Sequence, residues 1–320
     1  MEPLISVVIP TRERPSLVFR AVQSALRQTL NEIEVIVVID GPDAATSQVL
    51  IQLDDPKLHV RTLNQRRGCA GARNAGISEA KSHWIAFLDD DDEWFPQKLE
   101  IQLQIAKQSH HFYPIISCRF ISRSEGGDLI WPRRYPKPEE PLSEYLFCQS
   151  GVFGGEGVVL PSSILTKRDL LRKVPFRSGI PRHDDVDWLL RASTIEGVGV
   201  EFVPTTDPLL IWHMENDRNR ISNTADWHFS LSWIQANRQI VTPHAYASFL
   251  MIWTSLSAAK RRNWIAFWLL PWKAYREGKP KIIDFIAHLV IWLLPVKMRR
   301  LITVFLDRRE HERIYITGEK

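Results

Sequence analysis

Hydrophobic residues in the first third of the chain come in short runs that alternate with stretches of helical spacing. Except for a weaker run at Leu58–Leu63, they are apolar on both faces, which is typical of buried parallel strands. The expected strands are Ile5–Thr11, Glu34–Asp40, Leu58–Leu63 and Trp84–Leu88, and the expected helices are Pro15–Thr29, Ala44–Leu53, Gly71–Lys81 and Pro96–Lys107. This β–α repetition predicts an α/β fold with right-handed crossovers.

Beyond residue 112 the pattern is more mixed, and it then becomes helical. Further strands are expected at Tyr113–Ser122, Gly157–Leu165, Val198–Val203 and Leu209–His213, and a short helix at Asp184–Ser193. From about Trp227 the helical pattern runs to the end of the chain. We therefore expect a boundary near residue 240, with one domain before it and a helical region after it.

Composition is that of a soluble globular protein, with 44% hydrophobic and 24% charged residues among 320. The three cysteines, Cys69, Cys118 and Cys148, are odd in number and lack metal-ligand spacing. They indicate a reducing compartment rather than a disulfide framework. The N-terminal MEPLISVVIP has no basic region followed by a long apolar stretch, as a signal peptide would. We expect a cytoplasmic protein, or one on the cytosolic face of a membrane.

Four consecutive aspartates, Asp89–Asp92, follow the expected strand Trp84–Leu88. Ligands of such sheets bind at the carboxyl ends of the strands, where Thr11 and Asp40 are also expected. Crowded carboxylates are costly unless a cation neutralises them, and hard oxygen ligands suit Mg²⁺ or Mn²⁺. The cluster therefore indicates a metal–diphosphate site.

Helix capping is the alternative for the same aspartates. Asp91 or Asp92 could cap a helix whose first turn contains Pro96, since carboxylates suit a helix N-terminus. The cluster alone favours neither interpretation, and different aspartates can serve each purpose.

Two further segments carry candidate chemistry. Arg66–Ile77 (RRGCAGARNAGI) has glycines and basic groups at an expected helix start, which suits phosphate but also suits a flexible loop. Asp184, Asp185 and Asp187 precede WLLR, where acids commonly cap a helix.

Taken in order, VVIPTRERP, VIDGPD, GCAGARNAGI, IAFLDDDDEWFPQKLE and HDDVDWLLR resemble the family-2 glycosyltransferases of the GT-A fold. The resemblance covers roughly residues 4–215. It implies a Rossmann-like, mostly parallel sheet in a catalytic domain of residues 1–240, with a nucleotide-binding half at about 1–120 and an acceptor-binding half at 121–240. It also implies inverting, metal-dependent sugar transfer, with Mg²⁺ or Mn²⁺, from a nucleotide-diphosphate sugar to a glycan or lipid-linked acceptor. Cell-surface polysaccharide or glycolipid biosynthesis is the expected setting.

The resemblance assigns roles to single residues. Asp89 and Asp91 match the family's DxD motif and are the implied metal-site acids, and His213 is implied to lie near the metal. A packed histidine is the alternative for His213. Asp185 is the implied catalytic base, with Asp184 beside it. The implied nucleotide-sugar site comprises Pro10, Thr11, Arg14, Asp40, Arg73, Asn74, Asp89 and Asp90.

The C-terminal region, residues 241–320, is basic and rich in tryptophan. From Lys260 to Arg313 there are roughly thirteen basic and five acidic side chains. Its apolar segments fall short of the ~20 residues that a spanning helix needs. Tryptophan beside basic residues is typical of helices lying in a membrane surface, so we expect peripheral membrane association. The alternative is a helical subdomain that packs on itself or on the catalytic domain.

The sequence also bears on three other classes of protein. Nucleic acid is not an expected partner, because the basic residues alternate with apolar runs and no recognised motif is present. A sugar-nucleotide pyrophosphorylase would carry a glycine-rich loop where this chain has PTRERP. A catalytically silent nucleotide-sugar binder or membrane scaffold remains the alternative to an enzyme, although all the acids are present.

Overall fold

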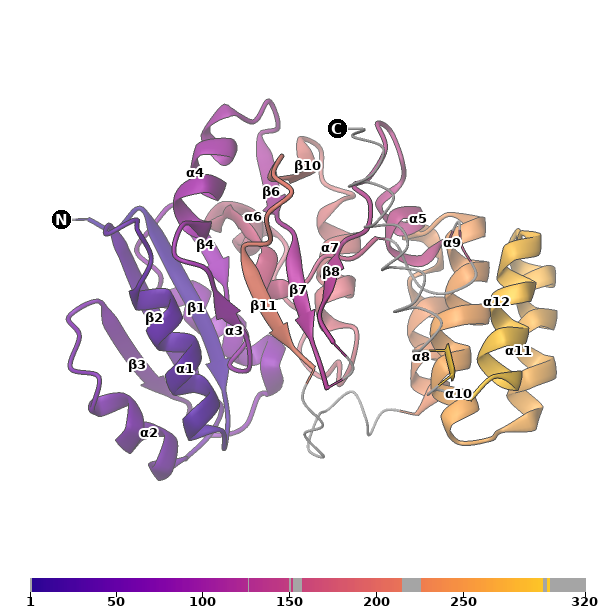
Figure 1. The fold of residues 1–320 in the computed structure, drawn as a ribbon, viewed down its shortest axis with the longest axis horizontal. Coiled ribbons are helices and arrows are strands. Elements are labelled where there is room, and N and C mark those ends of the chain that lie inside the picture. The colour runs from indigo at the N-terminus through magenta and orange to yellow at the C-terminus, as the bar shows by residue number, and fades with distance from the viewer. Residues whose placement is uncertain are drawn as a thin grey trace. The chain divides into compact units, whose positions relative to one another are not determined.

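The computed structural model describes residues 2–125, 127–149, 151, 157–214, 226–295 and 298–299 of the chain. The chain forms two compact units (Figure 1). The first comprises Met1–Ile130 and Val159–Asn216, and the second Trp131–Val158 and Asp217–Lys320. This division differs from the predicted boundary near residue 240, since the chain before that point already packs with later helices. Residues 296–297 and 300–320 of the predicted basic region lie outside the described residues.

The first unit is built on a mostly parallel sheet. Within the described residues its order is β10-β6-β9-β4-β1-β2-β3. These strands are β1 (Ile5–Thr11), β2 (Ile33–Ile39), β3 (Leu58–Thr62), β4 (Trp84–Phe87), β6 (Tyr113–Ser117), β9 (Leu165–Lys167) and β10 (Val198–Phe202). Only β9 runs antiparallel to its neighbours in this sheet. Both β1 and β2 are buried along their whole length, as continuous apolar runs predict.

The first four helices follow the strands in the predicted alternation: α1 (Pro15–Leu26), α2 (Ala44–Ile51), α3 (Gly68–Glu79) and α4 (Lys98–Gln108). The later helix α7 (Asp184–Ala192) was also predicted, whereas α6 (Arg168–Lys173) was not. Pro15 occupies the first turn of α1, where its missing N–H costs no hydrogen bond. α3 packs closely on β1 and β2 at Gly76, where a Cβ atom would lie 2.5 Å from Cγ1 of Val8. This close packing holds the second half of α3 against the sheet.

A smaller sheet has the order β5-β11-β7-β8, formed by β5 (Glu93–Trp94), β11 (Leu210–His213), β7 (Phe120–Arg123) and β8 (Leu129–Trp131). The predicted strand Tyr113–Ser122 is therefore two strands in different sheets. The predicted strand Gly157–Leu165 was wrong over most of its length. Pro161 begins a 3₁₀ turn, η1 (Pro161–Ser163), because proline has no N–H to donate to a strand ladder.

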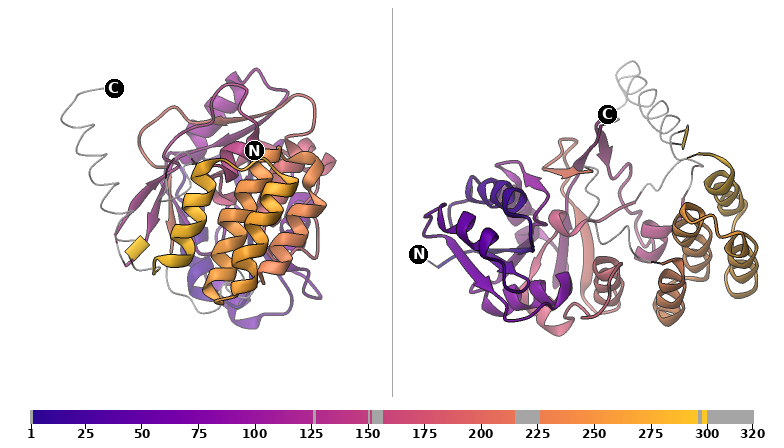
Figure 2. Two further views of the ribbon diagram at one scale, coloured as in Figure 1. Left: turned by 90° about the vertical axis from the view of Figure 1, so that its right-hand side faces the viewer. Right: turned by 90° about the horizontal axis from the view of Figure 1, so that it is seen from below.

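The second unit is helical, as the sequence predicts beyond residue 240 (Figure 2). Its elements are α5 (Leu142–Phe147), α8 (Trp227–Ala236), η3 (Arg238–Ile240), α9 (Pro243–Ser248), η4 (Phe249–Thr254), α10 (Ser255–Lys260), α11 (Trp264–Glu277) and α12 (Ile282–Leu293). The segments α9, η4 and α10 follow one another without a break, and η4 has π-helical hydrogen bonding. The rings of Phe147 and Trp233 lie 4.9 and 5.2 Å from that of Phe249, so aromatic packing joins α5 and α8 to η4.

Two predictions about this chain can be compared directly with the structure. Cys69, Cys118 and Cys148 are free thiols, as predicted. Among the described residues, no helix is both long enough and apolar enough to cross a membrane.

Candidate active site

The carboxyl ends of three neighbouring strands bring distant polar residues together in the first unit. In the sheet, β1 lies between β2 and β4, so Thr11, Asp40 and the four aspartates share one edge. The Thr11 hydroxyl donates to Asp90 Oδ2 at 2.7 Å, and the Asp40 amide donates to the Thr11 carbonyl at 2.9 Å. The sheet therefore gathers these residues as its strand order predicts.

Two of the four aspartates are buried. Asp90 is held by Thr11 and by Arg14, whose Nη1 lies 3.1 Å from Asp90 Oδ1. Burial nevertheless raises the pKa of Asp90 to about 6. Asp92 accepts a 2.5 Å hydrogen bond from the Ser162 hydroxyl, and burial raises its pKa well above the usual value. Protein partners and burial therefore turn these two carboxyls away from solvent.

The other two aspartates are partly exposed, with 29% of the Asp89 side chain and 23% of the Asp91 side chain accessible. They offer only carboxylate oxygens, the ligands that Mg²⁺ and Mn²⁺ prefer. Magnesium is usually held by one or two carboxylates together with substrate phosphates. The donor chemistry and the partial exposure of these two side chains therefore fit a divalent ion held by Asp89 and Asp91.

Arg73 joins the aspartates to α7. Its side chain is only 3% exposed, and it donates from Nη2 to Asp89 Oδ1 at 2.7 Å and from Nη1 to Asp184 Oδ2 at 2.8 Å. Its guanidinium also lies over the Phe176 ring, 5.4 Å from the centroid. A planar guanidinium can hold two carboxylates at once, whereas an ammonium acts as a point charge. One buried cation thus connects the end of β4 with the acidic pair.

Asp185 lies in the first turn of α7, beside Asp184. Burial and then the Asp184 charge raise its pKa to about 6, against the opposing effect of Arg73. A general base works best when its pKa lies near the operating pH. His183, immediately before α7, has φ of 70°, a conformation that is uncommon and costly for a residue other than glycine. The acidic pair is therefore held at a constrained helix start.

Asp187 differs from the acidic pair. Its fully buried carboxylate lies 2.7 Å from Arg191 Nε and 3.2 Å from Arg177 Nη1. These ion pairs hold α7 in place, so Asp187 serves the fold.

Several predicted nucleotide-site residues already have structural partners. Asp40 accepts from the amides of Arg67 and Gly68 at 2.7 and 2.9 Å, so it caps the start of α3. Asn74 donates to the Phe176 carbonyl at 2.7 Å and accepts from the Phe176 amide at 3.0 Å. Pro10 is buried within β1. These contacts position the site, and direct contact of these residues with a nucleotide stays a prediction.

His213 lies on β11 in the smaller sheet. Its Nε2 lies 2.7 Å from Oε1 of Glu93, which directly follows the aspartates on β5. The structure thus brings His213 next to the end of the aspartate segment. Its predicted contact with a metal stays a prediction.

Sequence reasoning missed two residues that shape the aspartate turn. The Ser162 hydroxyl accepts from the Asp89 amide at 3.0 Å and donates to Asp92, so it holds both ends of the turn. Arg20 donates to the Asp91 carbonyl at 2.8 Å. No local pattern points to Ser162, which lies far away in sequence. Arg20 could have been found, because it lies on the helix that begins just after Arg14.

Comparisons with known proteins agree with this geometry. The family model described as "Glycosyl transferase family 2" matches residues 6–174, more than half of the chain. "Amylovoran biosynthesis glycosyltransferase AmsB" of Erwinia amylovora is 27% identical over 74% of this chain and 78% of that protein. "Putative colanic acid biosynthesis glycosyl transferase WcaA" of Escherichia coli is 30% identical over 48% of this chain and 56% of that protein.

Solved structures show the same fold. The crystal structure of S. aureus TarS 1-349 in complex with UDP aligns with a TM-score of 0.56 and 15% identity. The alignment covers 100% of this chain and 92% of that one. This likeness agrees with the predicted GT-A fold and with the helical region that follows it.

Proposed function

The chain belongs to glycosyl transferase family 2, and from that premise we propose that it is an inverting, metal-dependent enzyme. It would transfer a sugar from a nucleotide-diphosphate sugar to a glycan or lipid-linked acceptor. We place it in cell-surface polysaccharide or glycolipid biosynthesis, as a cytoplasmic protein bound to the cytosolic face of a membrane. The names of the two bacterial relatives, which refer to amylovoran and colanic acid biosynthesis, support a polysaccharide acceptor.

The observation that carries the proposal is the ion-pair network through Arg73. It ties Asp89, at the candidate donor site, to Asp184, which is next to the candidate base Asp185. Donor and acceptor chemistry must meet within a few ångströms, because a catalytic base has to reach the attacking hydroxyl. The network brings the residues for both tasks into one place.

Asp185 has the properties that the reaction requires of a base. Its pKa of about 6 leaves it ionised at neutral pH while keeping it basic enough to accept a proton. It would take the proton of the acceptor hydroxyl as that oxygen bonds to the anomeric carbon. The bond from that carbon to the diphosphate breaks in the same step. One displacement of this kind inverts the anomeric centre.

Asp89 and Asp91 are the residues that would hold Mg²⁺ or Mn²⁺. When bound, such an ion offsets the negative charge that develops on the departing diphosphate. Arg14 reaches the same segment, with Nη1 3.4 Å from Asp91 Oδ2, and fixes that carboxylate. Thr11 and Arg14 together keep Asp90 turned into the sheet edge.

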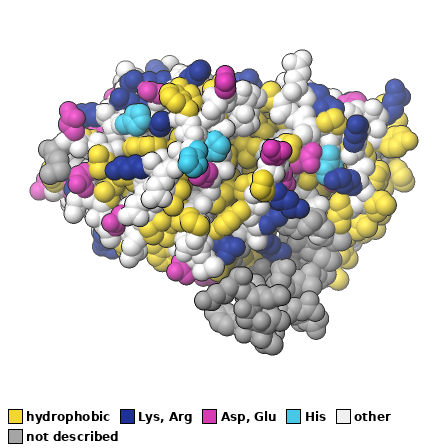
Figure 3. Space-filling view, turned by 90° about the horizontal axis from the view of Figure 1, so that it is seen from above, with side chains coloured by type: hydrophobic (Ala, Val, Ile, Leu, Met, Phe, Trp, Pro, Cys, Tyr) yellow, Lys and Arg dark blue, Asp and Glu magenta, His cyan; other side chains and the backbone are white. Residues whose placement is uncertain are grey.

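Exposed hydrophobic side chains on α11 and α12 support the membrane proposal. At helical spacing they form one face on each helix: Trp264, Ile265, Trp268, Trp272 and Tyr275 on α11, and Ile282, Phe285, Ile286, Leu289 and Leu293 on α12. Figure 3 shows hydrophobic side chains beside lysine and arginine side chains over these helices. An apolar face flanked by basic groups suits the surface of an anionic bilayer.

A transfer assay tests the proposal. The purified chain would be given UDP-, GDP- and dTDP-sugars with Mn²⁺ and a lipid-linked acceptor, and the linkage formed would be assigned by NMR. We expect one donor class to be used, with inversion at the anomeric carbon. Retention of configuration, or equal transfer after chelation of divalent ions, would contradict the proposed mechanism. Donor binding without any transfer would favour the silent binder.

A further inference from the structure

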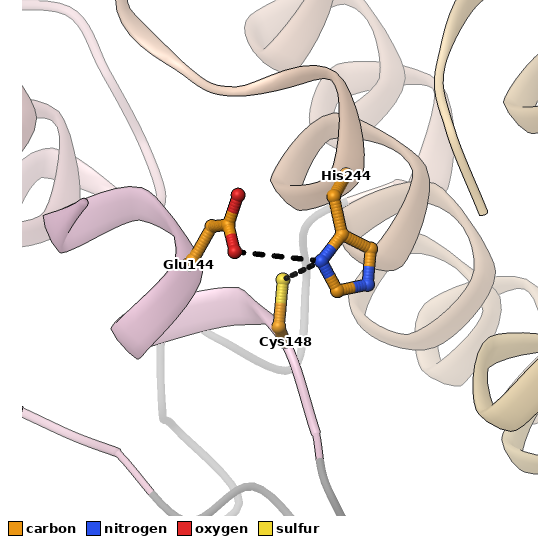
Figure 4. Close-up of side chains that lie close together, drawn as sticks. All are labelled: Glu144, Cys148 and His244. Carbon is orange, nitrogen blue, oxygen red and sulfur yellow. Dashed lines mark hydrogen bonds and ion pairs between the residues drawn. The ribbon is translucent and has the colours of Figure 1, made fainter. Parts of the chain in front are cut away.

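Three metal-binding side chains of different chemistry meet inside the second unit (Figure 4). Glu144 lies on α5, Cys148 directly follows that helix, and His244 lies in the first turn of α9. One donor atom from each residue lies within 4.8 Å of the other two. Cys148 and His244 are each only 9% exposed. This is the one such group of three that the described residues form.

We propose that Glu144, Cys148 and His244 bind a zinc ion that fastens α5 to α9. One thiolate, one imidazole nitrogen and one carboxylate form a donor set that suits zinc rather than the hard ions Mg²⁺ and Ca²⁺. A three-residue set also leaves a fourth tetrahedral position for water. This proposal is independent of the glycosyltransferase reaction, because the site uses no residue of the candidate active site.

The two distances from His244 Nδ1 to the other donor atoms fit a tetrahedral ion, and all three donor atoms lie within 4.8 Å of one another. Cys148 Sγ lies 3.3 Å and Glu144 Oε2 lies 3.6 Å from His244 Nδ1. Zinc bonds of about 2.3 Å to sulfur and about 2.0 Å to nitrogen or oxygen place tetrahedral ligands roughly 3.3–3.6 Å apart. An ion could therefore enter between these atoms with little rearrangement of the backbone.

A second layer of contacts orients the ligands. The second ring nitrogen of His244, Nε2, lies 3.5 Å from Oδ2 of the fully buried Asp284 and makes no hydrogen bond in this structure. Asp284 itself accepts from the Ser248 hydroxyl at 2.6 Å and from the Lys281 amide at 2.7 Å. Metal-bound histidines commonly donate their second N–H to a carboxylate, which fixes the tautomer and the ring orientation. Asp284 is placed to do this.

Glu144 is oriented in the same way. Its Oε1 accepts a 2.8 Å hydrogen bond from the Thr242 hydroxyl, and Oε2 is turned toward His244. Zinc binding would release the Cys148 thiol proton and require His244 Nδ1 to be unprotonated. The ion would then link two segments that are nearly a hundred residues apart in the chain.

Cobalt substitution of the full-length chain tests the proposal. Co²⁺ would be titrated into chelator-treated protein in excess Mg²⁺, which keeps hard-oxygen sites occupied. We expect one equivalent of Co²⁺ to bind with tetrahedral visible bands and a thiolate-to-cobalt charge-transfer band, and Zn²⁺ to displace it. Absence of the charge-transfer band in the folded wild-type chain would overturn the proposal.

Variants assign the ligands. Cys148→Ala should abolish the charge-transfer band, whereas Cys118→Ala, which removes a buried thiol of the first unit, should keep it. Asp284→Asn should weaken zinc binding by about 10–100-fold without changing the stoichiometry. A band that survives in folded Cys148→Ala, or one lost in Cys118→Ala alone, would place the metal elsewhere and contradict the assignment.

Discussion

Charged side chains are buried together at the end of β4 in the first unit, whereas large hydrophobic side chains are exposed together on α11 and α12 in the second. At the end of β4, Asp90 and Asp92 are 7% and 2% exposed, and Arg73 is 3% exposed. On α11, by contrast, Ile265 and Trp268 are 75% and 74% exposed. In a soluble protein, charged side chains are usually exposed and large hydrophobic side chains are usually buried, so both arrangements are unusual.

Both the buried charged side chains and the exposed hydrophobic ones cost free energy in the isolated protein. A buried carboxylate loses its hydration, which is unfavourable unless a partner compensates for it. An exposed apolar face stays in contact with water, so it does not gain the free energy that burial would give. A bound partner could lower each of these free-energy costs. A cation with a diphosphate would complete the charge balance in the first unit, and a lipid surface would cover the apolar faces of the second.

The largest expected effect comes from Asp185→Asn, which removes the proposed base while keeping the shape of the side chain. Transfer should fall by about 10²–10⁴-fold, the usual contribution of general base catalysis, with donor binding retained. Steady-state kinetics and donor binding would be measured together. Asp169→Asn is the matched control, since Asp169 is an exposed first-turn acid of α6 and should leave transfer unchanged. Equal losses in both variants would assign Asp185 to helix stabilisation.

The next effect tests the buried cation. Arg73→Met would leave Asp89 and Asp184 without their shared partner, and breaking a buried pair of this kind typically costs about 3–5 kcal/mol. Urea unfolding would measure the loss. The matched control is Arg61→Met, which breaks the exposed ion pair with Glu79 and should cost less than about 1 kcal/mol. Similar losses in the free energy of unfolding for the two variants would mean that the buried network around Arg73 stabilises the fold no more than an exposed ion pair does.

A third effect concerns pH. Because Asp185 must be ionised to accept a proton and its pKa lies at about 6, kcat/KM should rise with pH up to about 6 and then level off. Well below that pH, each unit of acidification should lower the rate about tenfold. Asp184→Asn removes a charge that raises the pKa of Asp185, so the midpoint should move to lower pH. A midpoint that stays fixed or moves upward would exclude this coupling.

The smallest effect tests the exposed face of the second unit. Ile265→Glu places a negative charge on the apolar face of α11, and binding to anionic vesicles should weaken by about tenfold. Ile51→Glu on α2 is the control, since Ile51 is 76% exposed but lies in the first unit. Co-sedimentation with vesicles would measure both variants. If neither variant changed binding, the proposed role of this face would fail.

The sequence predicted the positions of those candidate residues that are close together in the chain. Asp89–Asp92 are consecutive and follow an apolar run, so their place at a strand end could be read from the pattern. The partners of these residues could not be found in this way. Arg73 meets Asp184, and Ser162 meets Asp92, only because the sheet and its loops bring distant segments together. Such pairs depend on tertiary packing, which no local pattern encodes.

The same reason explains the errors in the predicted fold. Alternating strands and helices were found up to about residue 110, where β1, β2 and β4 are continuous apolar runs. The strand predicted through Pro161 was wrong, because the prediction followed the apolar residues and gave too little weight to Pro161, which has no N–H for a strand ladder. The group of Cys148 and His244 was also missed, since its ligands are spread over both segments of the second unit.

The most direct test of the central claim is calorimetric binding of UDP, GDP and dTDP by the full-length chain, first with Mn²⁺ and then with EDTA. The claim is that the carboxylates at the end of β4 form a metal–diphosphate site. We predict that one nucleotide binds, and that binding is lost with EDTA and in Asp91→Ala but kept in the exposed control Asp207→Ala. Binding that is unaffected by EDTA and by Asp91→Ala, or no binding by the folded chain, would contradict the claim.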